Sequence, residues 1–210
     1  MDTYKARLWQ MRHKISLWAE FVRVYREKHS VRMVMIMLTY KGVDDYKPGD
    51  INNFMKKMKQ CLGKNLLAFA WVAEVQPDRG AIHYHIIILA NKGTSIPKPD
   101  STRDFYGQIV PGGVPMWGHG WSGIHTANTP FYLLKYMGKE RQKDLSRYPK
   151  SCRLFAASIR GFSYEDKLLF RALTGKQKVP GVSGWEYKGS SVTDRYAREV
   201  LLPGDAEIDE

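Results

Sequence analysis

The sequence predicts an α+β fold in which an antiparallel sheet carries helices packed mainly on one face. Strand-like and helix-like stretches alternate along the 210 residues, and two of the strand-like stretches are joined by a tight turn. A hydrophobic content of 43% is enough for one domain with a full core. We expect this domain to cover residues 1–175 and an extended segment with an acidic tail to cover residues 176–210.

The first part of the chain is expected to form a helix, a strand and a second helix. Apolar residues recur at helical spacing over residues 3–28, with basic residues between them. The run Val31–Tyr40 is rich in Val, Met and Ile, which are typical of strands. Asp50 is a candidate N-cap for a helix over residues 51–62.

A hairpin is the clearest local feature of the sequence. Two strands, expected over residues 67–76 and 82–90, are joined by Pro77-Asp78-Arg79-Gly80. Proline presets the backbone of a turn, aspartate bonds to nearby backbone groups, and glycine accepts a positive φ. If the turn is centred between Asp78 and Arg79, Glu74 lies opposite His83 on the neighbouring strand.

The rest of the chain is expected to add shorter strands and helices. Thr129 and Pro130 are suited to the N-cap and the first position of a helix over residues 131–137. The other expected elements are strands over residues 118–127 and 153–159, a short helix near residues 101–109, and a helix over residues 163–173.

The charge of the chain is strongly positive. Lys and Arg number 33 against 21 Asp and Glu, which gives a net charge of +12. Residues 199–210 contain acidic residues and no basic ones, so the net charge of residues 1–198 is more positive than that of the whole chain. A basic body with an acidic tail indicates a polyanionic partner, most often nucleic acid. The alternative is that the charge serves solubility alone.

The composition also limits where the protein acts. No stretch approaches the roughly 20 apolar residues of a membrane span. The N-terminus lacks the apolar core of a signal peptide, because basic residues interrupt it. Cys61 and Cys152 show no metal-binding spacing. We therefore expect a reduced, cytoplasmic protein with no membrane association.

Three side chains of the hairpin form a candidate metal site. His83 and His85 are two residues apart in an apolar strand, so they project from one face. The expected register brings Glu74 to the same place. Two imidazoles and one carboxylate leave coordination positions open, which is typical of catalytic sites. Phosphate chemistry would favour Mg²⁺ or Mn²⁺. The alternatives are two hydrogen-bonded core histidines and a surface glutamate.

A pair of tyrosines forms a candidate nucleophile. Tyr132 and Tyr136 are four residues apart, so they lie on one face of the expected helix. Each is followed three residues later by a lysine, Lys135 or Lys139. A nearby lysine can lower the pKa of a phenol or neutralise a bound phosphate. Tyrosine attack on a phosphodiester would give a covalent phosphotyrosine. The alternative is an ordinary amphipathic helix face.

Together, these motifs resemble the HUH endonuclease superfamily, and within it the rolling-circle replication initiators (Rep) of phage and plasmid type with paired tyrosines. The three similar stretches are Met37-Leu38-Thr39-Tyr40, His83-Tyr84-His85 and residues 132–139. The resemblance covers about residues 31–165.

The resemblance implies an RRM-like sheet, a divalent metal held by Glu74, His83 and His85, and tyrosine attack on single-stranded or hairpin origin DNA. The products would be a 5′-phosphotyrosine and a free 3′-OH that primes synthesis. Tyr132 and Tyr136 would then alternate between initiation and termination. The sequence contains no Gly-x-x-x-x-Gly-Lys-[Ser/Thr] motif, so unwinding would need a separate helicase or supercoiling, and elongation a DNA polymerase.

Basic side chains downstream of the tyrosines are expected to hold the DNA backbone, while aromatic rings stack on unpaired bases. These candidates are Arg141, Lys143, Arg147, Lys150, Arg153 and Arg160.

Three other functions remain open at this point. A transposase of the same superfamily would share the chemistry, whereas a relaxase is disfavoured because its tyrosine usually precedes the histidines. A non-catalytic, RRM-like nucleic-acid-binding module would bind no metal. A metal-dependent hydrolase that uses water would leave no covalent adduct.

Overall fold

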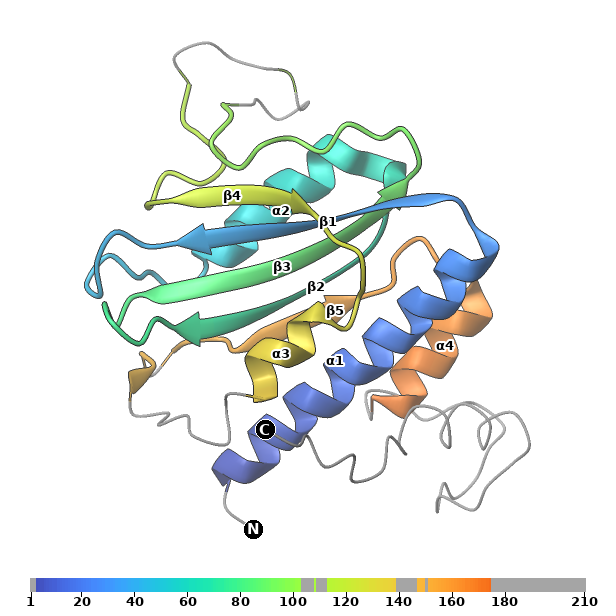
Figure 1. Cartoon of the computed structure of the whole chain (residues 1–210), viewed down its shortest axis with the longest axis horizontal. Helices are drawn as coiled ribbons and strands as arrows, with labels where there is room; N and C mark the ends of the chain where they lie inside the picture. Colours follow the sequence, from blue (N-terminus) through green and yellow to red (C-terminus); the bar gives the residue numbers. More distant parts are fainter. Residues whose placement is uncertain (1–2, 103–107, 109–112, 139–146, 150, 175–210) are drawn as a thin grey trace.

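The computed structural model describes residues 3–102, 108, 113–138, 147–149 and 151–174 (Figure 1). These residues form an α+β fold, as the sequence predicts. In chain order the elements are α1 (Thr3–Lys28), β1 (Val31–Thr39), α2 (Asp50–Leu62), the 3₁₀ turn η1 (Gly63–Asn65), β2 (Leu66–Val75), β3 (Ile82–Asn91), β4 (Ser122–Thr126), α3 (Tyr132–Gly138), β5 (Phe155–Ser158) and α4 (Tyr164–Leu173).

The five strands form one sheet in the order β4-β1-β3-β2-β5, and all neighbours are antiparallel (Figure 1). β3, the strand with the two histidines, is therefore at the centre. The hairpin between β2 and β3 has the expected register, with Glu74 opposite His83. Gly80 in its turn has a φ of +66°, which glycine adopts without steric cost.

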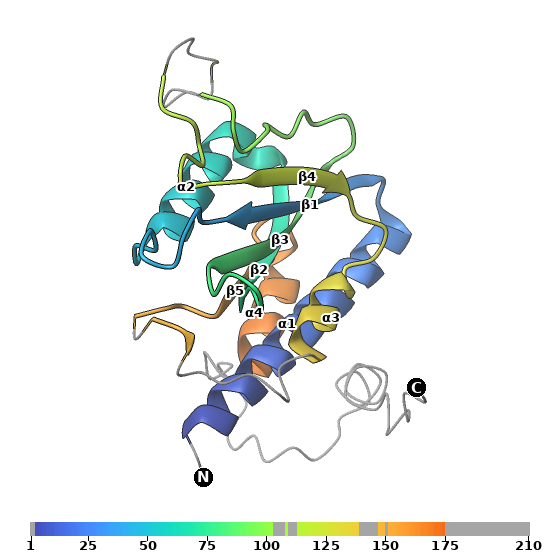
Figure 2. The ribbon, with the colours of Figure 1, turned by 60° about the vertical axis from the view of Figure 1, so that its left-hand side comes forward.

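Helices cover both faces of the sheet, but unequally. α1, α3 and α4 lie on one face and α2 lies on the other (Figure 2). The prediction that the helices pack mainly on one face is thus confirmed. The α2 face is an aromatic core, in which Tyr84 contacts Trp71, Tyr40 and Trp117, and Phe54 of α2 meets Trp117 edge to face. Such packing makes the central strands rigid.

The long helix α1 supports the opposite face. Met11, Ile15, Trp18 and Val22 recur every three or four residues and are all fully buried. The Trp18 indole also donates a hydrogen bond to the carbonyl oxygen of Ser158 in β5, at 3.1 Å. No helix in the described ranges is both long enough and apolar enough to cross a membrane.

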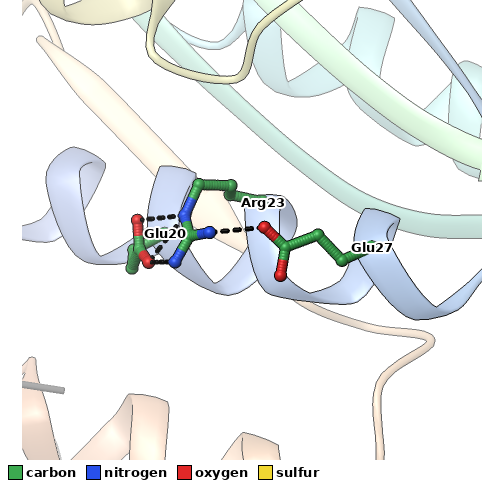
Figure 3. A network of polar contacts seen from close by, with 3 residues as sticks. All are labelled: Glu20, Arg23 and Glu27. Carbon is green, nitrogen blue, oxygen red and sulfur yellow. Dashed lines mark hydrogen bonds and ion pairs between the residues drawn. The ribbon is translucent and has the colours of Figure 1, made fainter. Parts of the chain in front are cut away.

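An ion-pair network within α1 neutralises its buried acid. Glu20 is buried beside the apolar stripe, and Arg23 bonds to both of its carboxylate oxygens (Figure 3). Arg23 also pairs with Glu27, one turn further on. A buried carboxylate without such partners would be costly, so the network allows the helix to bury this position.

Two expected helix starts are wrong in detail. Gly49 occupies the N-cap of α2, and Asp50 is already helical. The Asp50 carboxylate instead accepts a hydrogen bond from the Tyr40 hydroxyl at 3.1 Å and lies 3.4 Å from His119. α3 begins at Tyr132, after Pro130, although the Thr129 hydroxyl does accept a bond from a backbone N–H, that of Phe131. Tertiary partners therefore override local capping at Asp50.

The remaining expected elements are confirmed with small shifts. β4 and β5 are shorter than expected, and Ser163 caps α4 by accepting a bond from the Asp166 backbone N–H. The expected helix near residues 101–109 and the segment 176–210 lie largely or wholly outside the described residues.

Gly120 brings the chain before β4 into close contact with the end of β1. Backbone bonds join Thr39 N–H to Trp121 O at 2.8 Å and Lys41 N–H to His119 O at 3.0 Å. A Cβ atom at Gly120 would overlap the Thr39 carbonyl oxygen and lie 2.8 Å from the Lys41 nitrogen. Only glycine fits here without displacement of backbone.

We predict that Gly120→Ala lowers the free energy of unfolding by about 1–3 kcal/mol, because the added methyl group meets backbone atoms that cannot rotate away. Urea denaturation followed by circular dichroism measures this change. Gly42→Ala is the matched control, since a Cβ atom there makes only an ordinary contact at 3.5 Å with Asp45. Equal stability of the two variants would contradict the packing argument.

Candidate active site on the central strands

Glu74, His83 and His85, here called the polar trio, lie on one face of the two central strands. In β3, His83 sits between Thr39 of β1 and Glu74 of β2. His85 sits one pleat further along, between Met37 and Val72. Both histidines are buried. The alternation of the strand therefore places both imidazoles on the face that α1, α3 and α4 share.

Hydrogen bonds connect the trio to its neighbours. Nε2 of His85 lies 3.0 Å from Oε2 of Glu74, a diagonal contact across the hairpin. The Thr39 hydroxyl forms a hydrogen bond with Nδ1 of His83. The two imidazole rings are 4.4 Å apart between centroids. Because Thr39 bonds to Nδ1, Nε2 is the nitrogen of His83 that is left as a candidate metal ligand.

The surroundings keep His83 neutral. The pKa of His83 is lowered to about 4, first by burial and then by electrostatic interaction with His85 and Arg79, while Glu74 acts in the opposite direction. The imidazole is therefore neutral near pH 7. Neutral imidazole is the form that binds a metal ion.

The side chains of the polar trio are of the types that bind divalent metal ions, but their donor atoms are not arranged around one common position. Two imidazoles and a carboxylate are suitable ligands for Mn²⁺ and acceptable ones for Mg²⁺. Within the described ranges, however, no group of three His, Cys, Asp or Glu side chains is arranged to hold a metal ion as it stands. The Glu74–His85 hydrogen bond joins two of the donors to each other, so it would have to open for the trio to bind a cation.

Helix α3 brings the tyrosines to the trio. α3 packs against β2, β3 and α1. The Tyr136 ring stacks on the His85 imidazole, with centroids 3.4 Å apart and planes inclined by 16°. Tyr132 lies one turn earlier, 5.5 Å from Tyr136 between ring centroids, and is more exposed. The expected juxtaposition of trio and tyrosines is present.

The structure places one of the two expected lysines beside the tyrosines. The ammonium group of Lys135 lies 5.9 Å from the centroid of the Tyr132 ring, and Lys139 lies outside the described residues. The pKa of Tyr136 is raised above its usual value, first by burial, then by a hydrogen bond with Tyr132 and by the negative charge of Glu74. The expected lowering by a lysine therefore stays a prediction for Tyr136, whose lysine is Lys139, and burial is the largest cause of the raised pKa among the described residues.

Of the candidate DNA-binding residues that can be placed, Arg153 and Arg160 both lie near Lys59, whereas Arg147 lies at the hairpin turn. Nη2 of Arg147 donates to the carbonyl oxygen of Pro77, in the turn beside the trio. Arg153 lies over the Trp71 ring at 5.7 Å. Arg160 lies beyond β5. Three other candidates, Arg141, Lys143 and Lys150, lie outside the described residues.

A cationic cleft, here called the β5 cleft, surrounds Arg160 and has a volume of about 470 Å³. Its lining contains five basic side chains and, among the residues placed there, no acid. Burial lowers the pKa of Lys59, and the charges of Arg160 and Arg153 lower it further. The clustered charges thus repel one another, as in a site for an anion. The basic side chains are Lys14, Lys59, Arg160, Lys167 and Arg171.

The sequence analysis assigns no role to two residues of the site, Thr39, which it names only within the first Rep-like stretch, and Arg79. Thr39 orients His83, and Arg79 acts on its charge. The sequence feature that points to Thr39 is a hydroxyl at the end of an apolar strand. For Arg79 the sequence indicates only a turn residue, because its electrostatic effect on His83 depends on the fold.

Comparison with known proteins identifies the family. The family model for replication-associated proteins of the ORF2 type matches residues 33–141, which is more than half of the chain. The chain belongs to this family. The matched part of this replication-associated protein includes the whole polar trio, Thr39 and both tyrosines. No curated protein and no solved structure matched the chain.

Proposed function

We propose that this replication-associated protein initiates rolling-circle replication by nicking and rejoining single-stranded DNA through a covalent 5′-phosphotyrosine. The observation that supports this most strongly is the stacking of Tyr136 on His85. It brings a phenol into direct contact with His85, a member of the polar trio. The family match, which covers these same residues, supports a role in replication.

In this proposal, Glu74, His83 and His85 hold a divalent cation, Mg²⁺ or Mn²⁺. When bound, the cation would supply Lewis-acid polarisation of a phosphate oxygen. Thr39 fixes the ring of His83 through its hydroxyl, which leaves Nε2 for the site. Burial of both histidines limits the access of water, and this strengthens electrostatic interactions at the trio.

The nucleophile is a tyrosine of α3. The phenol oxygen gives up its proton and bonds to phosphorus, while the bond from phosphorus to the 3′ oxygen breaks. That oxygen takes a proton and leaves as a free 3′-OH. The bond energy is kept in the phosphotyrosine, so the reverse reaction rejoins the strand. We assign the first cleavage to Tyr136, which touches His85, and the second to Tyr132; Lys135 and Lys139 neutralise the bound phosphate.

Other macromolecules complete the reaction cycle. The substrate is single-stranded or hairpin origin DNA, whose backbone is neutralised by the basic surface of a chain with net charge +12. The β5 cleft gathers five cations from α1, α2, α4 and the end of β5, so we assign a stretch of DNA backbone to it. A DNA polymerase extends the free 3′-OH, and a separate helicase unwinds the duplex.

A second candidate function is a non-catalytic nucleic-acid-binding module. Its support is that Thr39 bonds to His83 and Glu74 bonds to His85, so both histidines have hydrogen-bonding partners within the sheet. Such a module would use the same sheet face but would form no covalent product. A transposase is less well supported, because the family match is to replication-associated proteins.

The adduct experiment separates these functions. Incubation with single-stranded origin DNA and Mn²⁺ should give a protein–DNA band on a denaturing gel, and EDTA should abolish it. Tyr136→Phe should reduce the initial adduct by at least about 100-fold, because the attacking oxygen is lost. The double variant Tyr132→Phe, Tyr136→Phe should form none. Tyr164→Phe is the matched control, since Tyr164 is exposed on α4.

An adduct that survives in the double variant would refute the tyrosine assignment. Cleavage without a shifted band would support a hydrolase that uses water, and binding without cleavage would support the non-catalytic module.

We also predict that the double substitution Lys59→Gln, Arg160→Gln weakens DNA binding and makes it less sensitive to salt. Each lost phosphate contact should reduce the slope of log K against log salt by about 1. Fluorescence anisotropy over a series of salt concentrations measures the slope. Lys92→Gln removes an exposed lysine beyond the end of β3 and is the control. If the double variant and the Lys92→Gln control show the same slope, the β5 cleft does not bind the DNA backbone.

A further inference from the structure

An exposed tryptophan lies at the sheet edge opposite the β5 cleft. Trp121 directly precedes β4, the edge strand, and 56% of its surface is exposed. Large aromatic side chains are usually buried, because their exposure to water is unfavourable. An exposed indole beside a candidate active site is available to contact a bound ligand.

The backbone pairing places Trp121 on the same face as the polar trio. Trp121 O accepts the N–H of Thr39 at 2.8 Å, and this continues the register in which Gly123 pairs with Met37. Thr39 in turn lies opposite His83 and bonds to it. Trp121 and His83 are thus two strand spacings apart, about 10 Å between their backbones.

The six-membered ring of the indole lies over Gly123 of the edge strand. A Cβ atom at Gly123 would lie 2.8 Å from Cη2 of Trp121 and 3.1 Å from Cζ2, so the ring lies directly over this glycine. The imidazole Nε2 of His125 would be 3.4 Å from the same Cβ position. The absence of a side chain at Gly123 therefore gives the indole its space on the sheet, and 56% of the Trp121 surface is exposed.

Among the described residues, the half of the sheet around Trp121 has less helix packed on it than the other half has. α1, α3 and α4 pack near β2, β3 and β5 (Figure 2). On β4, His125 and Thr126 are exposed, and Met37 of β1 is only partly buried. A strand of nucleic acid that reaches the trio from this side would pass over Trp121.

We propose that the outer face of Trp121 stacks on an unpaired DNA base beside the phosphate that is cleaved. This inference rests on the proposed function, because it takes the polar trio as the site of cleavage. Stacking on an aromatic ring selects single-stranded DNA, since the bases of a duplex already stack on one another. The basic charge of the chain favours a nucleic acid over an apolar partner. Trp121 and the β5 cleft then hold DNA at opposite edges of the sheet, with the trio between them.

Binding of an oligo(dT) of about 15 nucleotides, followed by fluorescence anisotropy in EDTA, tests this proposal without any cleavage. Trp121→Ala should weaken binding by about 5- to 100-fold, whereas Trp121→Phe should retain most of it. Duplex DNA of the same length should bind both variants equally. Trp9→Ala is the matched control, because Trp9 is also exposed (65%) but lies on α1, stacked on His13.

A second variant tests the geometry. Gly123→Val should displace the indole and weaken oligo(dT) binding in the same direction as Trp121→Ala. Thermal melting followed by circular dichroism should show Trp121→Ala as stable as the wild-type chain, because the side chain is exposed. A 2-aminopurine base in the oligonucleotide should be quenched by the wild-type protein and not by Trp121→Ala.

Unchanged oligo(dT) binding by Trp121→Ala would overturn the proposal, and so would an equal loss for duplex DNA. A dimer that forms through Trp121 and disappears in Trp121→Ala, measured by sedimentation, would overturn it in favour of a protein interface. The two proposals can fail separately. Trp121-dependent binding without any adduct would refute the nickase alone, and adduct formation with binding that is independent of Trp121 would refute the stacking site alone.

Discussion

The pairing register of β2 with β3 is the constraint on which the site depends. Side chains alternate between the faces of a strand, so one residue of slippage would send both histidines into the aromatic core on the α2 face. The turn at Gly80 fixes the register and sets Glu74 opposite His83. Burial of Tyr84 against Trp71 and Trp117 on the other face resists slippage, because that core would be lost. The same register thus builds the core and the site.

The two faces of the sheet therefore have different structural roles. The α2 face is apolar and rigid, and it holds the central strands in place. The other face carries polar groups that would be costly to bury without partners, and each of them has a hydrogen-bonding neighbour. α3 completes this face by laying Tyr136 on His85. Cations at the β5 edge and an indole at the β4 edge flank the site on either side.

Local chemistry explains why much of this arrangement was predictable. The hairpin, the strand that carries both histidines and the helix that carries both tyrosines each follow from neighbours in sequence. The structure confirms all three elements. The features that the sequence does not predict depend on tertiary contacts. Asp50 bonds to Tyr40 instead of capping α2, and the pKa of Tyr136 rises because its side chain is partly buried. The β5 cleft unites α1, α2 and α4, which no local pattern places together.

Calorimetric titration with Mn²⁺ in the absence of DNA tests the polar trio most directly. The wild-type chain should bind one Mn²⁺ ion, and His85→Ala and Glu74→Gln should each abolish this binding or weaken it by at least about tenfold. The comparison protein is His119→Ala, which removes another histidine that lies beside a carboxylate, 3.4 Å from Asp50. His119→Ala should bind Mn²⁺ as the wild type does. Binding that persists unchanged in His85→Ala, or no binding by the wild-type chain, would contradict a metal site on β2 and β3.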